Sequence, residues 1–446
     1  MVIHKRFNFI NFKISLRRWY GSALYVTGDK AQKTFAVLTP VIDFDNQTQH
    51  IHNLKQNVAR RQLEIDIDQI VRRWNFFQNI CERKKNLETT RSEIGKAVAD
   101  LLKNEAANQE QIEKLKLHAR VVKDDLKNLK ETFYEIEEST VLKVLDLPNT
   151  LHEKTPENET VVYCSPGSEI ASKISENHIN IAESLSYIKY INPSACYLKS
   201  EGALFEMSIL NYFRQCMLKS GYIQFSNTNF CRSVILEGCG GSFDQSFTLE
   251  EDSETDINRL HLCGSATVYP FMAYFTKHSI QQTNLPLKYF SLGKKYAPVN
   301  KDLPASFFNL SQQAVLNVFI ATLEEVEVLD SIIKELSEFY EHLGYHFRLT
   351  LLPAHQLEKS ESLRLSIQMY SNYIQSYVEV GNVSLHENYL SKRLLFTYNS
   401  NKSRKFPKII SGTLLNVPKM LGCVLENNFV KGTTLLSDVI KKHLFV

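Results

Sequence analysis

The sequence lacks the marks of several common protein classes. None of its eight cysteines form a CxxC pair, so neither a zinc knuckle nor a thioredoxin-type redox site is indicated. No window of about 18 apolar residues occurs, which argues against membrane insertion. Its histidines show no metal-ligand or triad spacing, so we predict no metal site and no cofactor. The net charge of only +3 means that any contact with nucleic acid must rest on a local patch.

The remaining composition is that of a globular protein with a sizeable core. The 446 residues are 43% hydrophobic and 23% charged, and this length suggests two or three domains. The scattered cysteines are typical of buried, reduced thiols.

Residues 1–28 differ from the rest of the chain. They contain five lysines and arginines, interleaved with apolar residues, and no acid precedes Asp29. A basic, acid-free segment that can form an amphipathic helix is typical of a mitochondrial transit peptide, and the alternative is a short basic arm. We therefore predict a transit peptide over 1–28, with cleavage near Tyr20, and location in the mitochondrial matrix.

Residues 62–142 contain no proline and carry two apolar ladders. The first ladder has a spacing of seven from Ile80 to Leu101, and the second alternates spacings of four and three from Leu115 to Ile136. A period of 3.5 is the coiled-coil signature. Because a short polar stretch separates the ladders, they predict an antiparallel helical hairpin. We expect an N-terminal domain over 29–150, with the hairpin arm at about 62–142.

From residue 151 to residue 446, helical segments alternate with short β-rich ones, without strict βαβ order. Segments such as "LKYFSLG" and "QQAVLNVFIAT" predict strands, whereas "LEEVEVLDSIIKELSEFYEHLG" predicts a helix. The expected class is α+β: a mainly antiparallel sheet flanked by helices.

Several stretches, in order, resemble seryl-tRNA synthetase, a class II aminoacyl-tRNA synthetase. "RKKNLETTRSEIGK" is similar to the first arm helix, and "LPNTLHEKTP" to the arm-to-core junction. "GALFEMSILNYFRQCMLKSGYIQFSN" resembles motif 1, "LPLKYFSLGKKYAPVN" motif 2, and "TLLNVPKMLGCVLENN" motif 3. The resemblance covers nearly the whole chain after residue 28. It implies a class II synthetase-like domain over 151–446.

The resemblance also implies that this domain is degenerate at its chemical positions. In the family, arginines of motifs 2 and 3 neutralise ATP phosphates, acids bind ATP and its magnesium, an aromatic stacks on adenine, and a glutamate holds the serine amine. The positions that depart from this pattern are Thr267, Ala297, Val299, Ala314, Leu385, Pro418 and Lys419. Glu379 is retained at the metal and ATP position.

Slippage of the alignment does not restore the missing groups, because residues 285–320 contain no arginine. Loss of one such donor typically costs about 10²–10³ in rate, and several are lost together here. We therefore expect an inactive seryl-tRNA synthetase paralogue that acts as a binding or regulatory subunit. Two alternatives remain: a divergent active serine–tRNA ligase or amino-acid-adenylating enzyme, supported by Lys419 and Glu379, and a nucleic-acid-binding protein outside translation.

The resemblance implies two kinds of partner. In the family the arm grips tRNA through phosphate contacts, and motif 1 builds the dimer. The expected contacts to tRNA or other mitochondrial RNA are Arg83, Lys85, Arg91, Lys96, Lys114, Lys116, Arg120 and Lys123. The expected dimer interface is Leu204, Phe205, Met207, Leu210, Phe213 and Met217. We expect a heterodimer with the active mitochondrial seryl-tRNA synthetase, with a homodimer as the alternative.

Overall fold

The computed structural model describes residues 22–28, 38–103, 109–166, 172–249, 259–299, 303–401 and 403–444. Most of the predicted transit peptide, residues 1–21, lies outside the described residues, as do residues 104–108 at the expected turn of the arm. Within the described part, no helix is long and apolar enough to cross a membrane.

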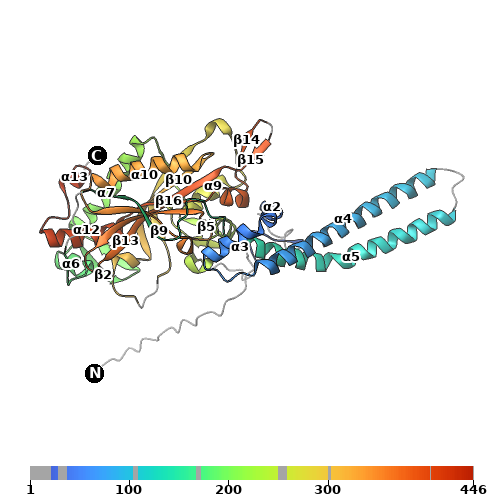
Figure 1. Ribbon diagram of the computed structural model, residues 1–446, viewed down its shortest axis with the longest axis horizontal. Coiled ribbons are helices and arrows are strands. Elements are labelled where there is room, and N and C mark those ends of the chain that lie inside the picture. Colours follow the sequence, from blue (N-terminus) through green and yellow to red (C-terminus); the bar gives the residue numbers. More distant parts are fainter. Residues whose placement is uncertain are drawn as a thin grey trace, which may run out of the picture.

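Two long helices form an arm that projects from one end of the molecule (Figure 1). They are α4 (Ile67–Lys103) and α5 (Gln109–Leu145), each of 37 residues, which corresponds to about 55 Å. The helices pack along each other, and both predicted ladders lie in the seam: Ile94 and Val122 are buried, and the other ladder residues are half-buried or buried. The pattern in the sequence thus places the apolar residues between the helices and the basic residues on the outside.

The residues that precede and follow the arm in the chain both bind one loop of the core, residues 358–361. Arg61 lies between α3 (Ile51–Arg60) and α4, and its guanidinium donates to the backbone oxygens of Glu358 (3.1 Å) and Glu361 (2.5 Å). Asn149, just after α5, donates through Nδ2 to the backbone oxygen of Ser360 (2.9 Å). Arg61 also donates to the backbone oxygen of Asn149 (3.0 Å), so the segment before α4 is linked to the segment after α5.

An eight-stranded sheet forms the centre of the core domain (Figure 1). Every neighbouring pair is antiparallel except β4 with β9. This confirms the predicted mainly antiparallel sheet in a mixed fold. In spatial order the strands are β1 (Thr160–Cys164), β11 (Phe347–Leu351), β12 (Leu363–Ser371), β13 (Ser376–Leu385), β16 (Lys408–Asn416), β10 (Gln312–Thr322), β9 (Leu287–Tyr296) and β4 (Ile223–Gln224).

Helices bury apolar residues on the sheet in two clusters. The larger cluster joins one face of the sheet to α6 (His178–Ser184), α7 (Ser200–Lys219), α10 (Glu325–Glu341) and α12 (Val417–Lys431). The second joins the base of the arm, including Trp74 and Phe77, to α8 (Ser233–Gly238), α9 (Val268–Phe275) and α11 (Tyr389–Leu394). Because the second cluster contains residues of both the arm and the core, the arm is packed onto the core as well as hydrogen-bonded to it.

Smaller elements complete the structure at the edges of the core. The helices among them are α2 (Phe44–Gln49) and α13 (Asp438–Lys441). Three small sheets consist of β2 (Ile188–Asn192) with β3 (Ala195–Leu198), of β5 (Phe230–Arg232), β7 (Leu260–Leu262) and β6 (Phe247–Thr248), and of β15 (Ser403–Lys405), β14 (Thr397–Ser400) and β8 (Ser279–Gln281).

Candidate functional site

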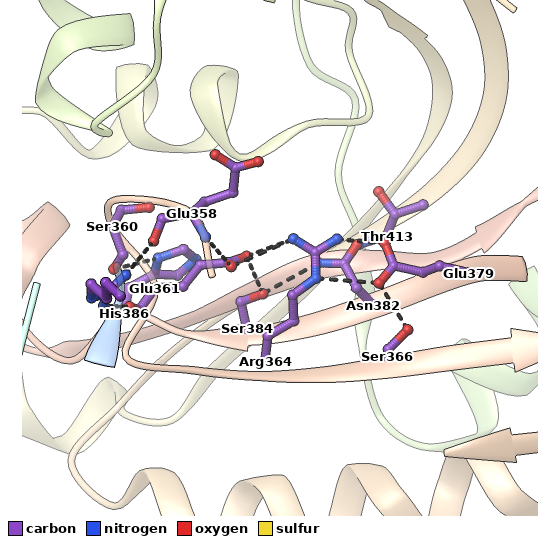
Figure 2. Close-up of polar contacts among 11 residues, drawn as sticks. Glu358, Ser360, Glu361, Arg364, Ser366, Glu379, Asn382, Ser384, His386 and Thr413 are labelled. Carbon is purple, nitrogen blue, oxygen red and sulfur yellow. Dashed lines mark hydrogen bonds and ion pairs between the residues drawn. The ribbon is translucent and has the colours of Figure 1, made fainter. Parts of the chain in front are cut away.

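A cluster of charged side chains occupies one face of the central sheet. It contains Arg364 on β12, Glu379 on β13, and Glu361 on the loop that holds the arm (Figure 2). Strand alternation explains the position of Arg364, because Leu363 and Leu365 on either side of it are fully buried in the apolar cluster of the opposite face. The sheet therefore turns one face to its core and presents a polar strip on the other.

Arg364 binds Glu379 with the planar fork of its guanidinium. Its Nη2 lies 2.5 Å from Glu379 Oε1, and its Nε lies 3.3 Å from Oε2. The hydroxyl of Ser366 also donates to Oε2 at 2.8 Å. Two-point pairing of this kind is among the stronger charged hydrogen bonds in proteins. Both oxygens of the Glu379 carboxylate are consequently engaged within the chain.

The same arginine contacts a second carboxylate, that of Glu361. Arg364 Nη1 lies 3.3 Å from Oε1, Ser384 Oγ donates to Oε1 at 2.5 Å, and the backbone N–H of Glu358 donates to Oε2 at 2.8 Å. Burial by itself would raise the pKa of Glu361, but the charge of Arg364 and the hydrogen bond from Ser384 outweigh it and lower that pKa. Glu361 is thus a buried, ionised and fully partnered carboxylate.

Two lysines lie beside this cluster. Lys419 is in the first turn of α12, and its pKa is lowered by burial and by the charge of Arg364, against the opposing effect of Glu379. Lys295 on β9 reaches solvent, and its pKa is lowered by partial removal from water and by Lys419 and Arg364. The face therefore gathers three cations around two carboxylates.

The degenerate positions from the sequence fall into two groups. Thr267, Pro418 and Lys419 lie at the starts of α9 and α12, and Ala297 and Val299 follow β9. The hydroxyl of Thr267 donates to the backbone oxygen of Gly264 at 3.0 Å and is buried. Thr267, which the resemblance aligns with the family's substrate-binding glutamate, thus uses its hydroxyl to bind its own loop.

The second group, Ala314 and Leu385, does not join the charged face. Both side chains are buried in the larger apolar cluster. Their neighbours face the polar side instead: Gln313 accepts a hydrogen bond from Asn416 at the cap of α12, and Ser384 binds Glu361. Because alternate residues of a strand point to opposite faces, a shift of one residue exchanges the two sets. Gln313 rather than Ala314 is therefore the position on β10 that faces the site.

Arg364, Glu361, Ser366 and Ser384 were missed by the motif comparison. The sequence pattern could have identified two of them, because Arg364 and Ser366 alternate with the apolar residues Leu363, Leu365 and Ile367, which are buried. Polar residues at a spacing of two within an apolar strand indicate a strand with one polar face.

The predicted RNA contacts lie where a partner could reach them. Arg83, Lys85, Arg91 and Lys96 are exposed on α4. Lys114, Lys116, Arg120 and Lys123 are exposed on α5. Lys114 forms an ion pair with Glu110 at 2.9 Å, one helical turn away. The arm therefore offers its bases on the surface, partly balanced by its own acids.

In the structure, some residues of the predicted dimer interface are buried and others are exposed. Phe205, Phe213 and Met217 are fully buried in the core of their own chain, so they cannot contact a partner. Leu204 and Met207 are 40% and 63% exposed on the outer side of α7, and Leu210 is half-buried. The regularly spaced apolar residues of α7 therefore pack mainly into the core. Of the six predicted residues, only Leu204 and Met207 remain as strong candidates for an interface.

The described residues do not form a ready metal centre. No group of three or more histidine, cysteine, aspartate or glutamate side chains in them is arranged to hold an ion. Glu379, the retained family position, is held by Arg364, and its second oxygen also accepts from Ser366. Arg364 therefore balances the charge of the Glu379 carboxylate and would compete with a divalent cation for its oxygens.

Comparison with known proteins agrees with this geometry. The model of the tRNA synthetase class II core domain (G, H, P, S and T) matches residues 247–428, which include β9, β10, the charged face and α12. This part of the chain is thus similar to a class II tRNA synthetase core domain.

Relatives of this synthetase-like chain cover nearly its full length. It is 27% identical over 432 residues to the serine–tRNA synthetase-like protein Slimp of Drosophila melanogaster, covering 94% of this chain and 92% of that protein. It is 24% identical to the mitochondrial serine–tRNA ligase of Mus musculus, covering 85% of this chain and 77% of the ligase.

Solved structures share the fold of the synthetase-like chain. Seryl-tRNA synthetase from Pyrococcus horikoshii, complexed with ATP, superposes with a TM-score of 0.75 at 16% identity, over 87% of this chain and 94% of that one. The cytoplasmic serine–tRNA ligase of Naegleria fowleri, in complex with AMP, has a TM-score of 0.71 at 16% identity, over 88% and 94% of the two chains. The fold of the synthetase-like chain is therefore that of seryl-tRNA synthetases.

Proposed function

We propose that this chain is a catalytically inactive paralogue of seryl-tRNA synthetase. The observation that carries the proposal is the pairing of Arg364 with both oxygens of Glu379. In an adenylate-forming enzyme of this family the corresponding carboxylate serves ATP and its magnesium. Here an arginine of the same chain binds that carboxylate, and its positive charge would compete with a metal ion for the same oxygens.

The surrounding positions support the same proposal. Thr267 stands where a carboxylate would hold the serine amine, and its hydroxyl bonds its own loop. Lys419 keeps a positive charge in the first turn of α12 but lacks the planar fork with which arginine grips a phosphate. With no arginine over 285–320, the site lacks the motif 2 arginine that would stabilise the charge that develops in the transition state.

The role that we propose is that of a binding subunit in the mitochondrial matrix. The basic segment 1–28 and the mitochondrial serine–tRNA ligases among the relatives support this location. The paired helices would act as a coiled-coil arm that contacts tRNA or other mitochondrial RNA. The chain would form a heterodimer with the active mitochondrial seryl-tRNA synthetase and would stabilise that enzyme or help to hold its tRNA.

ATP–pyrophosphate exchange tests the proposal directly. We expect no exchange above a mock preparation with serine or with any other amino acid of a full panel, and no serylation of tRNA. The control is an active mitochondrial serine–tRNA ligase, purified and assayed in the same way. Exchange with serine would show a divergent ligase, and exchange with another amino acid would show a different adenylating enzyme; either result would refute the proposal.

A further inference from the structure

Two long segments of the chain contain no acidic residue. Residues 257–301 and 388–425 together hold 13 lysines and arginines and no aspartate or glutamate. Since the whole chain carries a net charge of only +3, the positive charge is concentrated in these segments. Their position in the fold decides whether that charge forms a surface.

The two segments meet in one small sheet. Strand β8 comes from the first segment, and β14 and β15 come from the second. β14 pairs in parallel with β8 and antiparallel with β15. We call these three strands, with the residues that directly flank β8, the basic sheet. Figure 1 shows β14 and β15 projecting at the edge of the core, at the end from which the arm leaves.

The cations at the outer edge of the basic sheet are exposed. All three residues of β15, Ser403, Arg404 and Lys405, are exposed. Within the described residues, neither Arg404 nor Lys405 forms an ion pair. This differs from the arm, where acids lie among the bases and Lys114 is paired.

Neutral hydrogen-bonding groups surround these cations. Asn399 on β14 is exposed, and the segment from Gln281 to Asn284 presents two glutamines, a threonine and an asparagine to solvent. Beside β8, the ring of Tyr274 is 53% exposed and stacks on His278, with ring centroids 5.4 Å apart. Lysine, arginine, amide and hydroxyl groups are the usual donors to phosphate and sugar oxygens, and an exposed aromatic ring can stack on a base.

We infer that the basic sheet is a second RNA-binding surface, which holds the phosphate backbone beside the base of the arm. The inference extends the proposed RNA contact of the arm to the core, but it rests on different residues. Tyr274 is the one large apolar side chain that the described parts of the two segments expose. A protein partner would need an apolar centre, and a membrane surface would need inserted apolar residues, so the composition favours a nucleic acid.

Charge reversal in the full-length protein tests this inference. The test variant is Arg404→Glu with Lys405→Glu. The matched control is Lys189→Glu with Lys334→Glu, which makes the same change of charge at two exposed lysines outside the two segments. A third variant reverses Arg83, Lys85, Lys116 and Arg120 on the arm. Binding of a fluorescein-labelled serine tRNA transcript is measured over a range of salt concentrations, and thermal melting checks that each variant is folded.

We expect the test variant to bind roughly tenfold more weakly at low salt, with a slope of log affinity against log salt that is smaller by about 1.5, since two phosphate contacts are lost. The control variant should match the wild type. A folded test variant with unchanged affinity and slope would overturn the inference, whatever the arm variant does. If the test variant keeps its RNA binding but loses binding to vesicles of anionic phospholipid, the inference is also overturned. Such a result would indicate that the basic sheet binds a membrane surface. An effect of the test variant without any effect of the arm variant would support the basic sheet and contradict the proposed role of the arm.

Discussion

Arg364 is the residue on which the charged face depends. Its side chain is 17% exposed, and those of its partners Glu361 and Glu379 are 6% and 27% exposed. Removing one member of a buried ion pair leaves the other charges without a partner, which costs 3–5 kcal/mol when burial is complete. Because this cluster is partly in contact with water, we expect Arg364→Met to lower the free energy of unfolding by roughly 2 kcal/mol.

Urea denaturation measures this effect. Lys55→Met serves as the matched control, because the ion pair of Lys55 with Asp68 has both side chains about half exposed. Such surface pairs contribute about 0–1 kcal/mol. Equal and small effects of the two substitutions would mean that Arg364 does not hold the two carboxylates together.

Glu325, at the start of α10, is a buried acid with an unusual titration. Burial and the neighbouring carboxylate of Glu387 raise its pKa to about 8, although Lys408 opposes the shift. Between its ordinary pKa of 4.5 and about 8, the folded protein holds a proton here that the unfolded chain releases. Stability should therefore fall as pH rises through this range, by at most about 1.4 kcal/mol per pH unit.

Glu325→Gln should remove this dependence, because the amide stays neutral at every pH and its oxygen can still accept the hydrogen bond that Glu387 N–H gives to Glu325 at 3.0 Å. Thermal melting between pH 5 and pH 8.5 would test this. Glu327→Gln, at an exposed acid of the same helix, is the control and should keep the wild-type profile. A profile for Glu325→Gln that runs parallel to the wild type would show that Glu325 does not carry this proton.

Among the elements, the arm gives the sharpest test of RNA binding. Reversing charge at Arg83, Lys85, Lys116 and Arg120 together should weaken RNA binding and lower the salt slope by about one unit for each phosphate contact that is lost. All four side chains are exposed, so the change should leave the seam between α4 and α5 intact. Filter binding at several salt concentrations measures the slope, and an unchanged slope would show that the arm is only a spacer.

The sequence predicted elements better than it predicted the faces of those elements. Strand β10 covers the expected segment Gln312–Thr322, because a run of β-branched and apolar residues bounded by polar ones specifies a strand. The motif comparison nevertheless selected Ala314 and Leu385, which point into the core. Pairing register and twist decide which alternate residues face the site, and a motif aligned across gaps does not fix them.

Helix α7 shows the same limit. Its apolar residues follow a helical period, yet both a core face and an interface produce that period. Only packing against the sheet distinguishes Phe205, Phe213 and Met217, which are buried, from Met207, which is exposed. The pairing of Arg364 with two glutamates was equally out of reach, because Glu379 lies 15 residues away in sequence and meets Arg364 only through the hairpin of β12 and β13.

At the scale of the whole molecule, the proposed partner is the active mitochondrial seryl-tRNA synthetase. Co-expression followed by native mass spectrometry should give a 1:1 mixed species, whereas two homodimers that never exchange would rule it out. The outer side of α7 should contribute to the interface, so Met207→Glu should reduce the mixed species by placing a charge in an apolar contact. Leu117→Glu is the control, because Leu117 is 62% exposed on the arm, away from α7.

The fastening of the arm to the core has a mechanical consequence. Arg61 and Asn149 hold the backbone of residues 358–361, and that loop carries Glu361, a partner of Arg364. The arm, about 55 Å long, is therefore connected at its base to the charged face. A force on the arm, such as that of a bound partner, would act through Arg61 and Asn149 on the loop of residues 358–361. It would thereby reach Glu361 and its pairing with Arg364.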